Sequence, residues 1–260
     1  MEYVFDRIRK ILERLREAKH IFLFLDYDGT LTPIVSRPEE AHLSREMKGL
    51  LSNLKKNPRV HLAIVSGRSI ADIRKRVGLK GIYYVGNHGL EIFEPKHGTK
   101  RFVPKKVIRE MGRIRNRLNN QLSKVAGVHL EDKGCILAVH YRNADLKWVP
   151  SMLMTIKQEM KDSISSFCIG QGKFVFEVRP KSAGDKGVAV CELLNRVDQD
   201  GVLPLYIGDD QTDEGAFKVL RRQGITIMVG SPPFSSARYY VKDPAEVLQF
   251  FDRVRNELRS

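Results

Sequence analysis

Two aspartates, one residue apart, directly follow an apolar run near the start of the chain. The run 22–25 leads into Asp26 and Asp28, and Gly29 comes next. A short apolar run that ends at a glycine turn predicts a strand buried on both faces, and open parallel sheets bind ligands at the carboxyl ends of their strands. Adjacent carboxylates stay ionised only beside positive charge, which a hard divalent cation supplies. Taken alone, the same residues are also compatible with an ordinary turn.

Three later segments place polar side chains where a strand ends or a helix begins. Because strand ends gather at one edge of a parallel sheet, the set favours an assembled active site. For one of these residues, Lys186, the alternative is a surface position at a helix start, which the helix dipole makes mildly unfavourable for a cation. The residues are Ser66, Gly67 and Arg68 after the run 62–65, Lys186 before the helical pattern 188–194, and Asp209, Asp210 and Asp213 after the run 203–207.

In this order, the segments resemble the four motifs of the haloacid dehalogenase superfamily of phosphotransferases. Further fragments resemble the trehalose-6-phosphate phosphatase family within it, and the resemblance covers essentially the whole chain. Thr212–Asp213 favours this family over related general sugar phosphatases, which usually carry Asn-Asp there. The fragments are residues 26–34, 86–91, 131–133, 139–142, 177–180, 185–187 and 208–214.

The resemblance implies catalysis through an aspartyl-phosphate intermediate. Asp26 would be the nucleophile. Asp28 would protonate the departing sugar oxygen and then activate water. Ser66 and the ammonium of Lys186 would stabilise the phosphoryl oxygens as their charge changes.

The resemblance also implies Mg²⁺ as the cofactor. The ion would be held by Asp26, the backbone carbonyl of Asp28, and Asp209. Asp210 and Asp213 are further candidates, either for metal-bound water or for orienting the loop. Hard oxygen ligands also accept Mn²⁺ or Co²⁺, so the identity of the ion stays open.

Residues that would recognise the sugar phosphate follow from the same resemblance. Surface ion pairing, which contributes little to stability, is the alternative for each candidate in the middle of the chain. Period-two geometry places Lys173 and Glu177 on one strand face. Arg142 lies nine residues past Lys133, so both reach one disaccharide only if the strand bends. The candidates are Gly67, Arg68, Asn87, His88, Glu131, Lys133, Lys173 and Glu177.

Composition is that of an ordinary globular protein, with 260 residues, 42% hydrophobic and 8% aromatic. No apolar run approaches the ~18 to 20 residues that span a bilayer. The first residues are charged, so we expect no secretory signal. Cys135, Cys168 and Cys191 are odd in number and widely spaced. They predict free thiols in a reducing compartment, and thus a cytoplasmic protein.

The net charge of +14 could attract nucleic acid, a membrane surface or small anions. Residues 104–179 hold 14 Lys and Arg against 7 Asp and Glu. The excess is spread out, without aromatic interleaving, which indicates solvated helix faces and steering of a phosphorylated substrate. We therefore expect a small-molecule substrate, no nucleic-acid or membrane partner, and a monomer.

The order of apolar runs predicts an α/β fold with a Rossmann-like parallel-sheet core, haloacid dehalogenase-like by resemblance. Hairpin-like strands beside two helices interrupt the βα rhythm, which predicts an inserted α+β cap. We expect the core at 1–103 and 180–260 and the cap at 104–179. Core strands are expected at 21–26, 60–65, 82–86, 203–208 and 225–229, and helices at 3–19, 44–56, 69–77, 188–194 and 244–258.

The favoured function is that of a Mg²⁺-dependent phosphoric monoester hydrolase that converts trehalose 6-phosphate to trehalose, as in trehalose biosynthesis. A second possibility is a phosphatase of the same fold for another sugar or glycoside phosphate, such as sucrose phosphate or mannosyl-phosphoglycerate. The third is a non-catalytic basic binding protein. This third reading is weakened because every motif residue is present.

Overall fold

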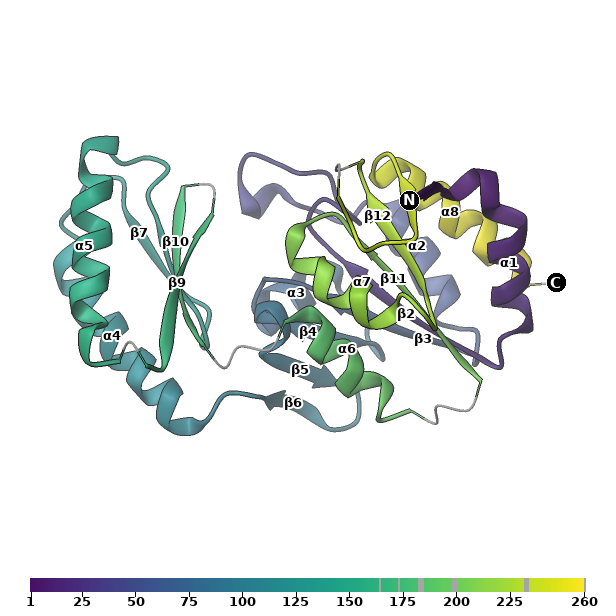
Figure 1. Ribbon diagram of the computed structural model, residues 1–260, viewed down its shortest axis with the longest axis horizontal. Helices are drawn as coiled ribbons and strands as arrows, with labels where there is room; N and C mark the ends of the chain where they lie inside the picture. The colour runs from purple at the N-terminus through teal and green to yellow at the C-terminus, as the bar shows by residue number, and fades with distance from the viewer. Residues whose placement is uncertain (164, 173, 182–184, 198–200, 232–233, 260) are drawn as a thin grey trace. The chain divides into compact units, whose positions relative to one another are not determined.

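The structure is a computed structural model, and it describes residues 1–163, 165–172, 174–181, 185–197, 201–231 and 234–259. The chain forms two compact units (Figure 1). Unit 1 comprises Met1–Lys100 and Gly184–Ser260, and unit 2 comprises Arg101–Ala183. Unit 1 is therefore built from two separate stretches of sequence, and unit 2 from one.

A nine-stranded sheet forms the centre of unit 1, in the order β1-β13-β12-β11-β2-β3-β4-β5-β6. Neighbouring strands from β1 to β4 in this order pair in parallel, whereas β5 pairs antiparallel with β4. The strands are β1 Glu2–Tyr3, β2 His20–Asp26, β3 Val60–Val65, β4 Tyr83–Gly86, β5 Glu91–Glu94, β6 Gly98–Arg101, β11 Val202–Gly208, β12 Ile225–Val229 and β13 Tyr239–Val241.

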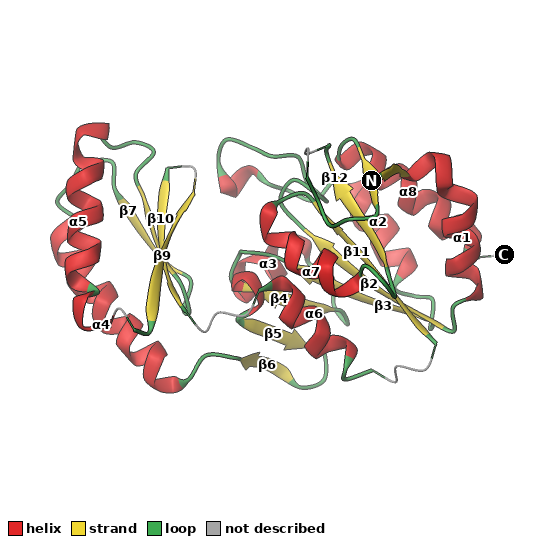
Figure 2. Cartoon of the chain, in the orientation of Figure 1, coloured by secondary structure: helices red, strands yellow, loops and turns green. Residues whose placement is uncertain are grey.

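Helices cover both faces of this sheet (Figure 2). Alternate residues of β2 explain why: Leu23 and Leu25 join a core with α1, α2, α3 and α8, while Phe22 and Phe24 point to the opposite face. There Phe24 stacks on Tyr206, whose ring meets Phe217 of α7 edge-on. The helices of unit 1 are α1 Ile8–Glu17, α2 Arg45–Leu54, α3 Ile70–Val77, α6 Lys186–Leu194, α7 Glu214–Leu220 and α8 Pro244–Glu257.

Unit 2 is a four-stranded antiparallel sheet with two helices, α4 Lys105–Leu122 and α5 Val149–Glu159. The strand order is β7-β8-β10-β9, with β7 His129–Asp132, β8 Leu137–His140, β9 Phe167–Gly172 and β10 Val175–Pro180. Leu137, Val139, Phe176 and Val178 pack with α4 and α5 in a core of their own. One face of this sheet is therefore apolar and covered by helices, as in many antiparallel sheets.

The ends of unit 1 differ from the sequence expectation. The helix expected at 3–19 begins only at Ile8, because β1 pairs with β13 and a 3₁₀ turn, Val4–Arg7, follows it. Strand β13 was not predicted, since three residues carry too little period-two pattern to register.

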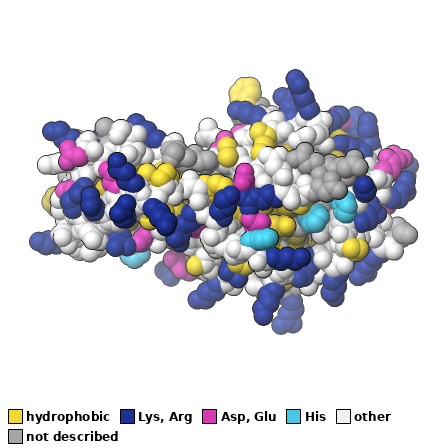
Figure 3. All heavy atoms as spheres, turned by 90° about the horizontal axis from the view of Figure 1, so that it is seen from below, with side chains coloured by type: hydrophobic (Ala, Val, Ile, Leu, Met, Phe, Trp, Pro, Cys, Tyr) yellow, Lys and Arg dark blue, Asp and Glu magenta, His cyan; other side chains and the backbone are white. Residues whose placement is uncertain are grey.

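Two surface properties bear on partners. Within the described ranges, no helix is both long and apolar enough to cross a membrane. Lys and Arg side chains are scattered over the face shown in Figure 3, with Asp and Glu between them, rather than gathered in one block. The strong positive charge therefore forms no single basic patch on that face.

Candidate active site

Both motif aspartates stand at the carboxyl end of β2, which lies between β11 and β3. Asp26 is the last residue of β2 and is buried, and Asp28 lies in the turn that follows. Gly29 closes this turn with a φ of +83°, and a Cβ atom there would lie 2.1 Å from a carboxylate oxygen of Asp209. Glycine is thus required both by the backbone and by the close approach of Asp209.

Lys186, the first residue of α6, is buried against two carboxylates. Its ammonium donates to Oδ1 of Asp26 at 2.6 Å and to Oδ1 of Asp213 at 2.8 Å. The Tyr206 hydroxyl donates to the same Asp213 oxygen at 2.6 Å. One carboxylate oxygen each from Asp26, Asp209 and Asp213 lie within 4.8 Å of one another. We call these three aspartates the acidic group.

The acidic group carries more negative charge than Lys186 balances, since three carboxylates face one ammonium. Burial raises the pKa of Asp26 well above its ordinary value, and the attraction of Lys186 offsets this only in part. Burial also raises the pKa of Asp209 to about 6. Although burial disfavours the ammonium, the charges of Asp26 and Asp213 raise the pKa of Lys186, which therefore stays cationic.

This arrangement fits a hard divalent cation. The donors are carboxylate oxygens, which Mg²⁺ and related ions prefer, and a cation would remove the charge imbalance that disfavours ionised Asp26 and Asp209. Asp213 already accepts hydrogen bonds from Lys186, from Tyr206 and from the backbone N–H of Asp210. The geometry favours Asp26 and Asp209 as ligands, with Asp213 holding Lys186 in place.

Asp210 lies outside the acidic group. Its exposed side chain accepts a hydrogen bond from the backbone N–H of Gln211 and, with Asp213, caps the short 3₁₀ helix Gln211–Asp213. This position fits the expected role of orienting the loop, and a contribution of Asp210 to the cation site stays a prediction. The 3₁₀ helix begins directly after β11. As a result, the Asp210 side chain is exposed to solvent, while the Asp213 side chain is buried at the end of the strand.

The turns after β3 and β4 are bonded to each other at the same edge of the sheet. The backbone N–H of His88 donates to the Ser66 carbonyl at 3.1 Å, and that of Asn87 donates to the Arg68 carbonyl at 2.8 Å. Asn87 and His88 have left-handed φ values of 51° and 56°. A Cβ atom on Gly67 would lie 2.4 Å from the His88 ring. Such strained, closely packed turns are common at functional sites.

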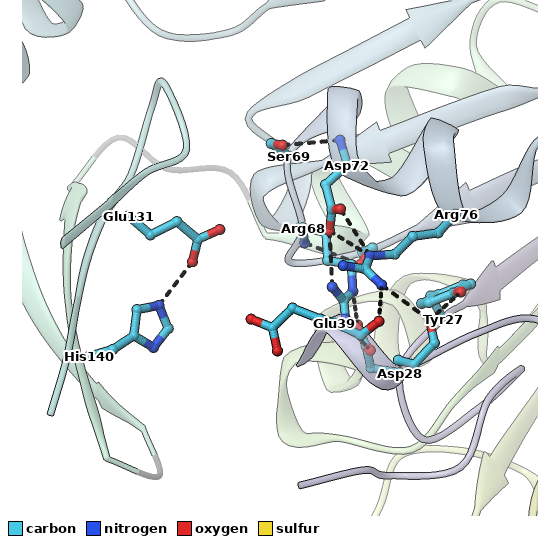
Figure 4. Close-up of polar contacts among 11 residues, drawn as sticks. Tyr27, Asp28, Glu39, Arg68, Ser69, Asp72, Arg76, Glu131 and His140 are labelled. Atoms are coloured by element: carbon cyan, nitrogen blue, oxygen red, sulfur yellow. Dashed lines mark hydrogen bonds and ion pairs between the residues drawn. The ribbon is translucent and has the colours of Figure 1, made fainter. Parts of the chain in front are cut away.

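The Arg68 side chain takes a position that the sequence did not predict (Figure 4). Its Nε donates to Oδ2 of Asp28 at 2.7 Å, and its Nη2 donates to Oδ1 at 2.6 Å. Its Nη1 donates to Asp72 at 2.9 Å. The sequence suggested a substrate contact for Arg68, which stays a prediction. In the structure the Arg68 guanidinium binds the Asp28 carboxylate through two hydrogen bonds. Asp28 consequently faces Arg68 and lies outside the acidic group.

Candidate sugar-binding residues of unit 2 share one face of its sheet. Glu131 and Glu177 lie on either side of Ala138, in register with it. Because the neighbours of Ala138 on β8 point into the helix-covered core, Ala138 and both glutamates point the other way. We call this the open face of unit 2.

An ion pair and a histidine–carboxylate hydrogen bond lie on or beside the open face. Lys133, in the turn after β7, donates to Glu177 at 2.9 Å. His140 Nε2 lies 2.9 Å from Glu131 Oε2 (Figure 4). Lys173 falls outside the described residues. The structure thus brings Glu131, Lys133 and Glu177 together within unit 2.

Several residues that support the site were missed by sequence reasoning. Thr30, Glu91 and His140 lie inside fragments that carry the family resemblance, but no role was assigned to them. Tyr206 is a single polar residue inside an apolar run and gives no pattern to detect. Asp72 and Arg76 are different, because their four-residue spacing is a detectable helix signal. The missed residues are Thr30, which donates to Asp209; Tyr206, which donates to Asp213; Glu91, which accepts from Asn87; and Asp72, Arg76 and His140.

Comparison with known proteins gives consistent matches. The model of the family described as Trehalose-phosphatase matches residues 24–245. Trehalose-phosphate phosphatase B of Arabidopsis thaliana is 36% identical over 253 residues, which cover 92% of this chain and 67% of the relative.

Solved structures share the fold. The C-terminal domain of C. albicans trehalose-6-phosphate phosphatase superposes with a TM-score of 0.78 at 24% identity, covering 95% of this chain and 96% of that one. A haloacid dehalogenase-like hydrolase from Bacteroides thetaiotaomicron gives a TM-score of 0.65 at 15% identity, covering 91% and 100%. At these identities the structural likeness speaks for the fold alone.

Proposed function

The chain belongs to the trehalose-phosphatase family, and from this premise we propose that it hydrolyses trehalose 6-phosphate to trehalose and inorganic phosphate. The family match spans most of the chain. The fold is the haloacid dehalogenase-like α/β fold. The roles of individual residues below are part of the proposal.

In the proposed first step, a carboxylate oxygen of Asp26 attacks phosphorus and the bond to the sugar oxygen breaks. Asp28 supplies the proton that the departing oxygen needs. In the second step Asp28 takes a proton from water, the water oxygen attacks the phosphoryl group, and Asp26 is released as a carboxylate. One proton is therefore given and one recovered by the same carboxyl group in each cycle.

Lys186 and Ser66 support these steps electrostatically. The ammonium of Lys186, 2.6 Å from Asp26, orients the nucleophile and lies where phosphoryl oxygens would bring negative charge. Ser66, buried after β3, offers a hydroxyl at the same edge of the sheet. A divalent cation held by Asp26 and Asp209 would neutralise phosphoryl oxygens when bound; we propose Mg²⁺.

One observation carries the proposal: segments from both stretches of unit 1 bring Asp26, Lys186, Asp209 and Asp213 together at the carboxyl edge of one parallel sheet. A generic α/β protein has no reason to bury two carboxylates, and partly bury a third, around one lysine, because desolvating charges is costly. A phosphoryl-transfer site requires this charge density.

We propose that unit 2 is the cap domain and recognises the sugar. The open face offers two carboxylates and an ammonium, Glu131, Glu177 and Lys133, which are suitable partners for sugar hydroxyls. Unit 2 is one continuous stretch between the two stretches of unit 1, as expected for an inserted cap.

The test is phosphate release from a panel of substrates in the presence of Mg²⁺. The panel contains trehalose 6-phosphate, sucrose 6-phosphate, mannosyl-3-phosphoglycerate and glucose 6-phosphate. We expect trehalose 6-phosphate to give the highest kcat/KM, by about tenfold or more. A higher value for another member would reassign the substrate, and no magnesium-dependent turnover on any member would refute the enzyme assignment.

Two further proposals concern the state of the protein. All three cysteines lie in the described part of the chain and none forms a disulfide, which supports a reducing, cytoplasmic environment. We also propose a monomer. Light scattering of the purified protein checks the monomer directly, and a molar mass near twice 29.7 kDa would contradict it.

A further inference from the structure

The carboxylate of Asp28 is held at one end of a series of alternating charges, which continues through Arg68 and Asp72 to Arg76 (Figure 4). Both oxygens of Asp28 accept from Arg68, at 2.6 and 2.7 Å. Two parallel N–H···O bonds of this kind fix direction as well as distance. The position of the Asp28 carboxylate is therefore set by the position of the Arg68 guanidinium.

Arg68 is itself fixed on its other sides. Its Nη1 donates to Asp72 at 2.9 Å, and its guanidinium lies 5.7 Å from the centre of the buried Tyr27 ring. Only 12% of the Arg68 side chain is exposed. Contacts of a shielded arginine are less screened than those of a surface pair and hold it more firmly.

Asp72 is held in turn by Arg76, whose Nε lies 2.9 and 2.8 Å from its two oxygens. Arg76 Nη1 donates to the carbonyls of Glu39 and Ala41 at 3.1 and 3.3 Å. The Ala41 carbonyl also accepts the Tyr27 hydroxyl at 2.9 Å. The chain of contacts thus closes on Tyr27, the residue immediately before Asp28.

Helix stabilisation alone explains only part of this arrangement. Residues 68, 72 and 76 are four apart, and such pairs stabilise a helix modestly. The contact of Arg68 with Asp28, however, joins residues forty positions apart on different elements. That contact adds nothing to α3, and it holds the carboxyl group to which the proposed function gives the proton transfers.

We propose that Asp72 and Arg76 are positioning residues that act through Arg68 on Asp28. They set the direction of the Asp28 carboxyl group, which in the proposed function gives a proton to the leaving oxygen and takes one from the attacking water. The inference rests on the proposed function, because it presupposes that Asp28 transfers the proton.

The test compares two leaving groups in Asp72→Asn. A sugar oxygen needs a proton to depart, whereas the nitrophenolate of p-nitrophenyl phosphate departs without one. We expect single-turnover release of the sugar to slow about tenfold, with KM changed little, because misplacing a catalytic group by about an ångström has effects of this order. Release of nitrophenolate should slow by less than about twofold. Equal slowing of both, or slowing of neither, would overturn the proposal.

A double variant makes the test specific. If Asp72 acts through Asp28, Asp72→Asn should change sugar release by less than about twofold when Asp28→Asn is already present, because coupled residues are not additive. A second full tenfold loss in that background would show that Asp72 acts elsewhere. Arg76→Gln should show the same selectivity as Asp72→Asn with a smaller loss, and Asp72→Glu should restore part of the rate.

Two control variants remove one negative or one positive charge at residues outside the series of contacts from Asp28 to Arg76. Asp252→Asn breaks an aspartate–arginine pair on α8, and Lys75→Gln removes an exposed cation beside Arg76 on the same helix. Both should keep the wild-type ratio of the two release rates. Failure of the proposed substrate would be seen separately, in the wild-type panel, and the leaving-group comparison would then use whichever alkyl phosphate the wild type hydrolyses.

Discussion

The edge of the parallel sheet in unit 1 and the open face of the sheet in unit 2 both present ion pairs, but in very different surroundings. The side chains of Lys186 and Asp213 are 3% and 0% exposed. On the open face, the side chains of Lys133 and Glu177 are 14% and 19% exposed, and those of His140 and Glu131 are 34% and 45% exposed. Buried ion pairs depend on every partner, while exposed pairs contribute little and can be rebuilt with water. The edge proposed for the chemistry and the face proposed for sugar recognition therefore differ in their tolerance to change.

The largest effect is expected at the buried edge, from Asp26→Asn. The amide keeps the shape but cannot attack phosphorus, so kcat should fall by at least about a thousandfold with KM altered only a few-fold. Phosphate release measures it, and residual activity above about one percent would remove Asp26 from the nucleophile role. Asp210→Asn, on the exposed neighbour that caps the 3₁₀ helix, should keep at least about a tenth of the wild-type rate.

Removing Asp213 should show how strongly the buried edge depends on its partners. Asp213→Ala leaves Lys186 and the Tyr206 hydroxyl without an acceptor they now share. Because Lys186 keeps its contact with Asp26, the free energy of unfolding should fall by about 1–3 kcal/mol, the cost of leaving buried polar groups without a partner. Denaturant unfolding of the metal-free protein measures this. A loss below about 1 kcal/mol would mean that these buried contacts contribute no more to the free energy of unfolding than an exposed ion pair does.

On the open face we expect affinity rather than chemistry to suffer. Glu177→Gln keeps the side-chain shape but weakens its bond with Lys133 and would weaken the contact proposed for it with a sugar hydroxyl. KM for trehalose 6-phosphate should rise about tenfold with kcat within about twofold. Glu159→Gln, which breaks a pair with Arg117 on the helical side of unit 2, is the control and should leave both constants unchanged. A fall in kcat alone would move Glu177 out of sugar binding.

The smallest effect concerns the opposite end of the parallel sheet, where His61 stands near the start of β3. Burial, helped by the neighbouring His20, lowers the pKa of His61. Its contribution to stability is therefore complete above the unfolded pKa, about 6.5, and is lost as pH falls through the folded value. In His61→Gln the unfolding free energy should depend less on pH between 7 and 5. An unchanged pH dependence would contradict this.

Much of the fold could be predicted because the strands of unit 1 are short apolar runs that end at polar residues. The family and the fold class predicted from the motifs are confirmed by the comparisons. β1 and β13 were missed because strands of two or three residues form through pairing in the folded protein and leave no local pattern in the sequence.

The site was less predictable at the level of side chains. The sequence placed Asp209, Asp210 and Asp213 after one strand. It could not tell which of their side chains would be buried at the strand end, since that depends on the 3₁₀ helix. It likewise could not show that Arg68 turns to Asp28, because a rotamer depends on the neighbours available in the fold. The roles of these residues, the domain boundaries and the sugar contacts remain predictions.

Building unit 1 from two stretches of sequence has a consequence for how the protein is made. Strand β2 needs β11 as a neighbour, and Thr30 meets Asp209 across 179 residues. During synthesis, β11 is made only after all of unit 2, which is a continuous stretch with its own core. Until then, one edge of β2 has no partner strand. Unpaired edges invite aggregation. The nascent chain is thus most vulnerable, and most in need of chaperones, during the interval between the synthesis of these two strands.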